Sequence, residues 1–211
     1  MFKPSEIYHN SSKRQLVHKL LMNNALQMLN KAKIVANIET ALILAKVSQK
    51  FLQSTNPSEN EDGLQLFIAL MNCYEHIIDE TVIVSAFENF AKSKLLKKMY
   101  IVHEFDSSQD DDVQKKIKSR QKKFPIHIKT YLAAHDRQLT YIFRDTTLLV
   151  SILLSQKYVK LYGLSTPCIE QLKLLNRTRN VLHMNTSITS SINLQKIEAI
   201  YELKNAIEKH I

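Results

Sequence analysis

The sequence predicts an all-α protein, and three observations support this class. The 211 residues include only two glycines and four prolines, so the chain lacks the turn residues that a protein with many strands needs. Apolar residues make up 45% of the chain and charged residues 23%, which is typical of a globular domain. Apolar residues also recur at helical spacing along most of the sequence. We therefore expect residues 1–211 to form a single all-helical domain, a bundle of helices.

Composition excludes several classes of function. Gly63 and Gly163 stand alone, so the glycine-rich phosphate loops of nucleotide enzymes are absent. Cys73 and Cys168 lack CxxC spacing, and we expect two buried thiols in place of a zinc site or a disulfide framework. We expect no metal and no cofactor. The first residues contain no apolar core of signal-peptide length, and no uncharged run is long enough to span a bilayer, so we expect a cytoplasmic protein without a membrane partner.

The first half of the chain predicts three helical regions. Residues 12–31 form the first, with Ser11 or Ser12 as cap, and 38–52 the second. The apolar stripe of the first consists of Leu16, Leu20, Ala25, Leu26 and Leu29. Residues 54–63 are a polar loop by composition. Residues 64–105 are mostly helical with a break near 79–81, and the stretch MYIVHEF at their end suits a short strand or an extended exit.

The second half predicts a charged loop and three more helices. Residues 127–162 form one long helix that Gly163 ends. Thr166 and Pro167 act as cap and first helical position of a helix that reaches Met184. A polar linker at 185–191 leads to a closing helix at 192–207.

The loop near 106–125 changes from acidic to basic along its length. One interpretation is a solvated helix whose charges complement its dipole. The other is a surface that follows RNA phosphates, and the net charge of +9 favours a polyanionic partner. The basic side chains of this candidate RNA-binding surface are Lys115, Lys116, Lys118, Arg120, Lys122 and Lys123.

The segment LNRTRNVLHMN at 175–185 is the strongest candidate site. Arg179 and His183 are four residues apart and share a helix face, whereas Arg177 lies about 120° from His183 on a regular helix. Beside a phosphate, a guanidinium binds the nonbridging oxygens while an imidazole moves a proton, which suits metal-free RNA cleavage. The alternative is that both side chains satisfy carbonyls at the helix end.

This segment resembles the motif of the HEPN family, helical-bundle domains in which an Arg, usually followed by Asn or another polar residue, precedes a His, with four to six residues between the two. Arg179-Asn180 matches the Arg-polar pair but leaves three residues before His183, while Arg177 leaves five. The resemblance implies a bundle with an HEPN-like core that forms a homodimer with two facing motifs.

The resemblance also implies a function. His183 would be the general acid or base in attack of the RNA 2′-hydroxyl on the adjacent phosphate. Arg179 or Arg177 would stabilise the charge, and Asn180 would orient the histidine or the phosphate. The protein would be a metal-independent endoribonuclease of a toxin-antitoxin or phage-defence system, with an antitoxin or defence partner.

Two alternatives stay open. Some HEPN proteins have lost catalysis, and this chain would then be a helical RNA- or protein-binding regulatory module. His135-Asp136, with His103 upstream and Asp145 downstream, also resembles the His, His-Asp and Asp set of all-helical metal phosphohydrolases (HD type). Against this alternative, Asp145 follows Asp136 closely on what the sequence predicts to be one continuous helix.

Overall fold

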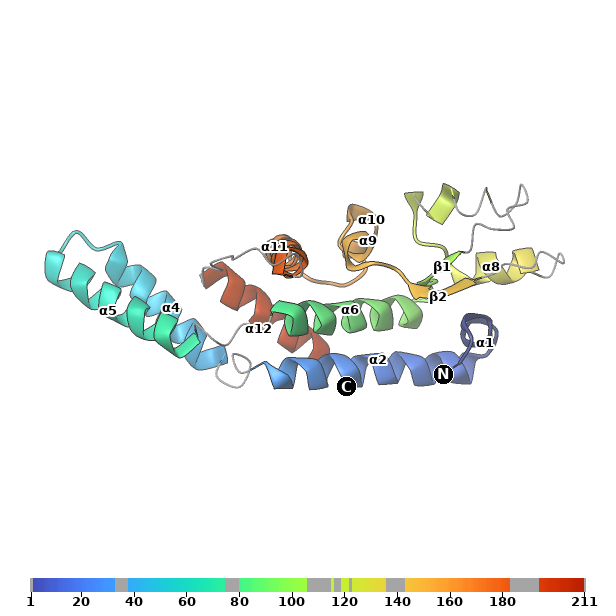
Figure 1. The fold of residues 1–211 in the computed structure, drawn as a ribbon, viewed down its shortest axis with the longest axis horizontal. Coiled ribbons are helices and arrows are strands. Elements are labelled where there is room, and N and C mark those ends of the chain that lie inside the picture. Colours follow the sequence, from blue (N-terminus) through green and yellow to red (C-terminus); the bar gives the residue numbers. More distant parts are fainter. Residues whose placement is uncertain are drawn as a thin grey trace. The chain divides into compact units, whose positions relative to one another are not determined.

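The computed structural model describes residues 2–32, 38–74, 80–105, 115, 119–121, 123–135, 143–182 and 194–210. These residues are mostly helical and include one small two-stranded sheet (Figure 1), so the expected all-α class is confirmed at this coarse level. The chain divides into two compact units. The first comprises residues 1–24, 88–163 and 211, and the second comprises residues 25–87 and 164–210.

Each unit has its own set of elements. The first unit holds α1 (Pro4–His9), the first part of α2 (Ser11–Lys31), the last part of α6 (Glu80–Lys97), β1 (His103–Phe105), α8 (Ile128–His135), β2 (Phe143–Thr147), α9 (Val150–Leu153) and α10 (Gln156–Val159). The second unit holds the remainder of α2 and of α6, with α4 (Ile38–Leu52), α5 (Pro57–Tyr74), α11 (Thr166–Leu182) and α12 (Leu194–Glu208).

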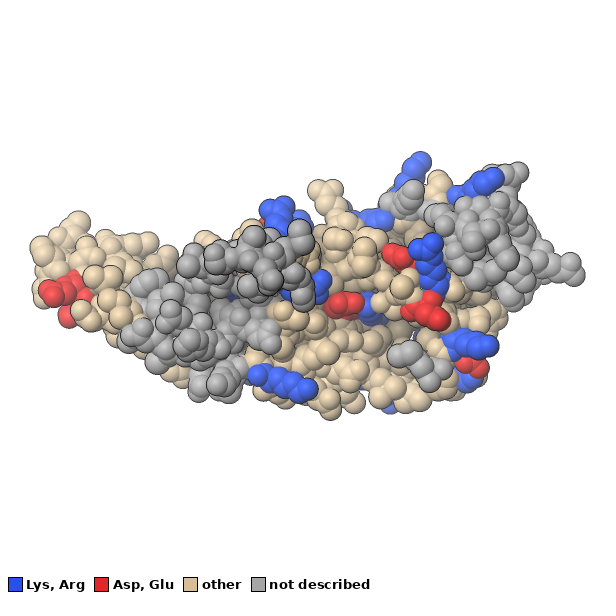
Figure 2. Space-filling view, in the orientation of Figure 1, with Lys and Arg blue, Asp and Glu red and all other residues tan. Residues whose placement is uncertain are grey.

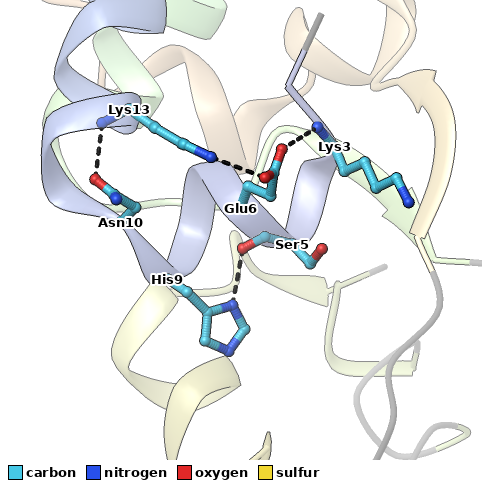
Figure 3. Close-up of polar contacts among 6 residues, drawn as sticks. All are labelled: Lys3, Ser5, Glu6, His9, Asn10 and Lys13. Carbon is cyan, nitrogen blue, oxygen red and sulfur yellow. Dashed lines mark hydrogen bonds and ion pairs between the residues drawn. The ribbon is translucent and has the colours of Figure 1, made fainter.

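Polar contacts fix the short helix α1 against the start of α2 (Figure 3). The Glu6 carboxylate accepts hydrogen bonds from the Lys13 ammonium at 2.8 Å and from the Lys3 backbone N–H at 3.0 Å. The Asn10 side chain accepts the Lys13 N–H at 3.0 Å and so caps α2, in place of the expected Ser11 or Ser12. These bonds set the direction in which α2 leaves α1.

The last turn of α6 ends in a Schellman motif built without glycine. The Tyr100 N–H donates to the Leu95 carbonyl at 2.9 Å, and the Met99 N–H donates to the Leu96 carbonyl at 3.0 Å. This pattern requires a left-handed residue after the helix, and Met99 adopts it with φ 64°. The chain then turns back and enters β1 through the buried residues Ile101 and Val102.

The two strands form an irregular antiparallel pair in the first unit. His103 lies opposite Thr147 and Phe105 opposite Phe143, so β2 accommodates two extra residues and bulges around Asp145. Aromatic rings pack the sheet against α1 and α8, with centroid separations of 5.0 Å for Tyr8–Phe143 and 5.1 Å for Tyr131–Phe143. The expectation that 99–105 ends in a short strand is thus confirmed.

The single long helix expected at 127–162 is wrong. The described part of this range contains α8, β2, α9 and α10 instead. Its apolar residues do recur at helical spacing, but Phe143–Thr147 gains a backbone partner in β1, and this long-range pairing overrides the local pattern. Gly163 does adopt the left-handed conformation expected of it, with φ 76°.

In the second unit, α4 and α5 pack against each other, and Gly63 allows their backbones to approach closely. A Cβ atom at Gly63 would lie 2.6 Å from the Phe51 Cβ and 2.8 Å from the Leu52 backbone nitrogen. The predicted loop at 54–63 is therefore mostly helix: α5 begins at Pro57, after the cap Asn56. The glycine serves a close helix contact, whereas the sequence suggested a turn.

A capped start orients α11 against α12. The Ser165 hydroxyl accepts the Cys168 N–H at 3.2 Å, so Ser165 is the cap and Thr166 is already helical, one residue earlier than predicted. Glu202 of α12 accepts hydrogen bonds from both the backbone and the hydroxyl of Ser165 at 2.6 Å. A carboxylate at this end also complements the helix dipole.

Candidate functional site

The buried stripe of α11 becomes polar toward its C-terminal end. Its apolar members Cys168, Ile169, Leu172 and Leu175 are buried as expected. The next positions on the same face are Asn176, which is only 7% exposed, and Arg179. Among the described residues, neither the buried Asn176 Oδ1 nor the buried Arg179 Nε has a hydrogen-bond partner. Two adjacent polar groups thus continue a core-facing stripe.

The two arginines of the motif differ in their surroundings. Arg177 is exposed, whereas Arg179 is partly buried and places one guanidinium nitrogen 3.5 Å from the Oδ1 of Asn180, an exposed neighbour. Arg179 therefore lies on the buried stripe and Arg177 does not. His183 lies outside the described residues, so the structure brings together Asn176, Arg179 and Asn180 of this site.

Half of the candidate RNA-binding surface can be located. Lys115, Arg120 and Lys123 are exposed in helical turns, and Lys116, Lys118 and Lys122 lie outside the described residues. On the face drawn in Figure 2, the described Lys and Arg side chains lie in small separate groups with Asp and Glu between them. No continuous basic groove crosses the described part of this face.

The alternative metal site is only partly visible. Asp145 lies on β2, so the expected continuous helix through Asp136 and Asp145 is wrong. Asp136 and the side chain of His135 lie outside the described positions. The side chains that the structure describes contain no group of three or more potential metal ligands.

His103 instead belongs to a polar network of the first unit, and Asp145 lies near enough to act on its charge. The Tyr8 oxygen accepts the backbone N–H groups of Val102 and His103, both at 3.1 Å. Because both lone pairs of the phenol are then used, its O–H donates to His103 Nδ1, 2.5 Å away. The imidazole proton therefore sits on Nε2. Pro4 at the start of α1, followed by Glu6, is the sequence signal that could have predicted this helix.

A buried lysine borders the same network. Lys92 is 7% exposed, forms an ion pair with Glu88, and donates to the Thr147 hydroxyl at 2.5 Å. Burial, reinforced by the Lys92 charge and opposed by Asp145, lowers the pKa of His103 to about 4. The imidazole is thus neutral at physiological pH. Burial likewise raises the pKa of Tyr8 above its ordinary value, so the phenol keeps its proton.

None of the described helices is long and apolar enough to cross a membrane. No protein-family model matches the chain, and no curated protein or solved structure shows significant similarity to it.

Proposed function

We propose that the chain has an HEPN-like helical core and acts as a metal-independent endoribonuclease, with Arg179 as its phosphate-binding arginine. The observation that carries this proposal is the pair of buried, unpartnered polar atoms on α11, Asn176 Oδ1 and Arg179 Nε, among the described residues. A buried polar atom without a partner costs about 1–3 kcal/mol. Such groups call for an explanation, and a site that binds a polar ligand supplies one.

The chemistry follows from the residue types of the motif. The Arg179 guanidinium offers a planar set of donors that matches two phosphate oxygens. His183 would take the proton of the 2′-hydroxyl while O2′ forms a bond to phosphorus. The bond from phosphorus to the 5′-oxygen then breaks, and that oxygen takes up a proton. The products are a 2′,3′-cyclic phosphate and a 5′-hydroxyl, and no metal or cofactor takes part.

The proposal includes a homodimer and a role in a toxin-antitoxin or phage-defence system, which the resemblance to the HEPN family would imply. A noncatalytic RNA-binding module is the second candidate, and the exposed side chains Lys115, Arg120 and Lys123 favour it. Such side chains bind the RNA backbone without cleaving it. RNA binding without cleavage separates this candidate from the first.

An RNA cleavage assay in EDTA tests the proposal. We expect wild-type protein to release fragments with cyclic phosphate ends and His183→Ala to lose at least about 100-fold in rate, as general acid-base catalysis predicts. RNA binding should persist in this variant, which serves as the control for folding. Retained binding with no cleavage by the wild type would support the regulatory module. Cleavage that needs Mn²⁺ and depends on His135 and Asp136 would support the phosphohydrolase.

A further inference from the structure

The first unit contains a pocket of about 690 Å³, within the range of about 300–1,000 Å³ typical of small-molecule sites. Helices α1 and α2 supply most of its apolar wall, through Pro4, Ile7, Leu16, Val17, Leu20 and Leu21. The polar side chains Asn24, Lys92, His103, Asp145 and Thr147 also line it. The pocket therefore combines an apolar wall with a compact polar group.

Two leucines in this wall are more exposed than the sequence predicts. The sequence pattern assigned Leu16 and Leu20 to the buried stripe of their helix, yet they are 48% and 50% exposed. Ala25 and Leu29, farther along the same predicted stripe, are fully buried. The apolar surface of Leu16 and Leu20 thus faces the pocket, and an apolar ligand would remove it from water.

Hydrogen bonding at the polar end selects the group that fits there. His103 is 9% exposed, and its Nδ1 accepts from Tyr8, so Nε2–H is a donor with no partner among the described residues. The Lys92 ammonium already contacts Glu88 and Thr147. Asp145 provides an exposed carboxylate as acceptor. The polar end thus offers a neutral donor beside an acceptor.

Charge decides between ligand classes. The charge of Lys92 is matched by Glu88, and Asp145 adds a negative charge that disfavours a carboxylate ligand. A cationic head group is also disfavoured, because the Nε2–H donor and the Lys92 ammonium would repel it. An uncharged amide fits both polar groups, because its carbonyl can accept a hydrogen bond from the His103 Nε2–H and its N–H can donate one to the Asp145 carboxylate.

We infer that the first unit is a binding site for a small uncharged amphipathic molecule, whose apolar chain lies against α1 and α2 and whose amide group lies at His103 and Asp145. This site is separate from the motif on α11, which belongs to the second unit. It does not depend on the proposed nuclease activity.

A fluorescence displacement experiment on the full chain tests this inference. The neutral apolar dye N-phenyl-1-naphthylamine is the probe, and octanamide, octanoate and octylamine are the competitors. We expect octanamide to displace the dye at concentrations about tenfold lower than octanoate or octylamine, the difference that one well-made hydrogen bond supports. Failure of the dye to bind, or preferred binding of octanoate or octylamine, would overturn the inference.

Two pairs of variants locate the site. Leu20→Glu should weaken dye binding at least about tenfold, whereas Leu174→Glu, at a helical leucine of matched exposure (49%) in the second unit, should not change it. Equal losses in both would indicate adsorption to apolar surface and would contradict the inference. His103→Asn keeps an acceptor for Tyr8 but lacks the Nε2–H. It should weaken octanamide binding about tenfold, and an unchanged octanamide affinity would also contradict the inference.

Discussion

The hydrogen bonds of Tyr8 define the chemistry of the first unit at the scale of single residues. The phenol O–H donates to His103 Nδ1, and its oxygen accepts the backbone N–H groups of Val102 and His103. One side chain thus satisfies three polar groups at the start of β1. The imidazole is held in one tautomer as a result. A protonated Nδ1 would have to give up the Tyr8 hydrogen bond.

This arrangement predicts a loss of stability in acid. The unfolded chain binds a proton at His103 below the ordinary pKa of 6.5, whereas the folded chain does so only near pH 4. Between these values the unfolded state binds more protons, so the free energy of unfolding falls as the pH falls, by up to about 3 kcal/mol. His18, whose pKa burial also lowers, adds a change in the same direction.

The variant His103→Asn isolates this contribution, because asparagine accepts the Tyr8 hydrogen bond and does not titrate. Urea unfolding at pH 7 and pH 4.5 should show a smaller loss of stability in the variant than in the wild type. His9→Asn, at an exposed position, is the matched control and should behave as the wild type does. An equal pH dependence in wild type and His103→Asn would contradict the account of this network.

At the same scale, the choice between Arg177 and Arg179 shows what a sequence leaves open. The family spacing favours Arg177, while helix geometry pairs Arg179 with position 183. The structure places Arg179 on the buried stripe and Arg177 in solvent. Both arginines suit a helix surface, so only the packing of α11 distinguishes them.

At the scale of elements, helices defined by their own sequence were predicted well. The predicted helix 38–52 matches α4, and the predicted helix that starts at Pro167 matches α11, which starts one residue earlier. Predictions failed where a distant partner decides the conformation. Phe143–Thr147 is a strand because β1 lies beside it, and Gly63 lies within a helix where the close approach of α4 leaves no room for a Cβ atom. No local pattern encodes either contact.

The end of α6 gives a test at this scale. Met99 has a left-handed conformation that costs a non-glycine residue about 1–2 kcal/mol, and glycine adopts it without strain. Met99→Gly should therefore raise the free energy of unfolding by about 1 kcal/mol. Lys97→Gly, two residues earlier at the last helical position of α6, should instead lower it, by up to about 1 kcal/mol. Denaturant unfolding of both variants measures the contrast, and destabilisation by Met99→Gly would contradict the assignment of this cap.

At the scale of the whole molecule, composition and periodicity were sufficient for the all-α class but not for the location of the polar sites. The scarcity of glycine and proline correctly indicated few strands. The pocket of the first unit, however, combines α1, α2, α6 and both strands, segments whose meeting depends on tertiary packing. The net charge of +9 favours a polyanionic partner and does not indicate where it binds.

The central claim is that Arg179, and not Arg177, is the phosphate-binding arginine of a nuclease. Among the described residues the partly buried Arg179 side chain makes one long hydrogen bond, of 3.5 Å to Asn180, and its Nε has no partner, so Arg179→Ala should lower the stability of the free protein by no more than about 1 kcal/mol. Arg177→Ala removes an exposed arginine two residues away and is the matched control. Thermal unfolding of the two variants checks that both are folded.

The most direct measurement is the single-turnover rate of RNA cleavage in EDTA by these two variants. Loss of a donor to a charged transition state lowers the rate by about 100- to 1,000-fold, and we predict this loss for Arg179→Ala. We predict a rate within about threefold of the wild type for Arg177→Ala. Equal rates in the two variants, or the larger loss in Arg177→Ala, would contradict the claim.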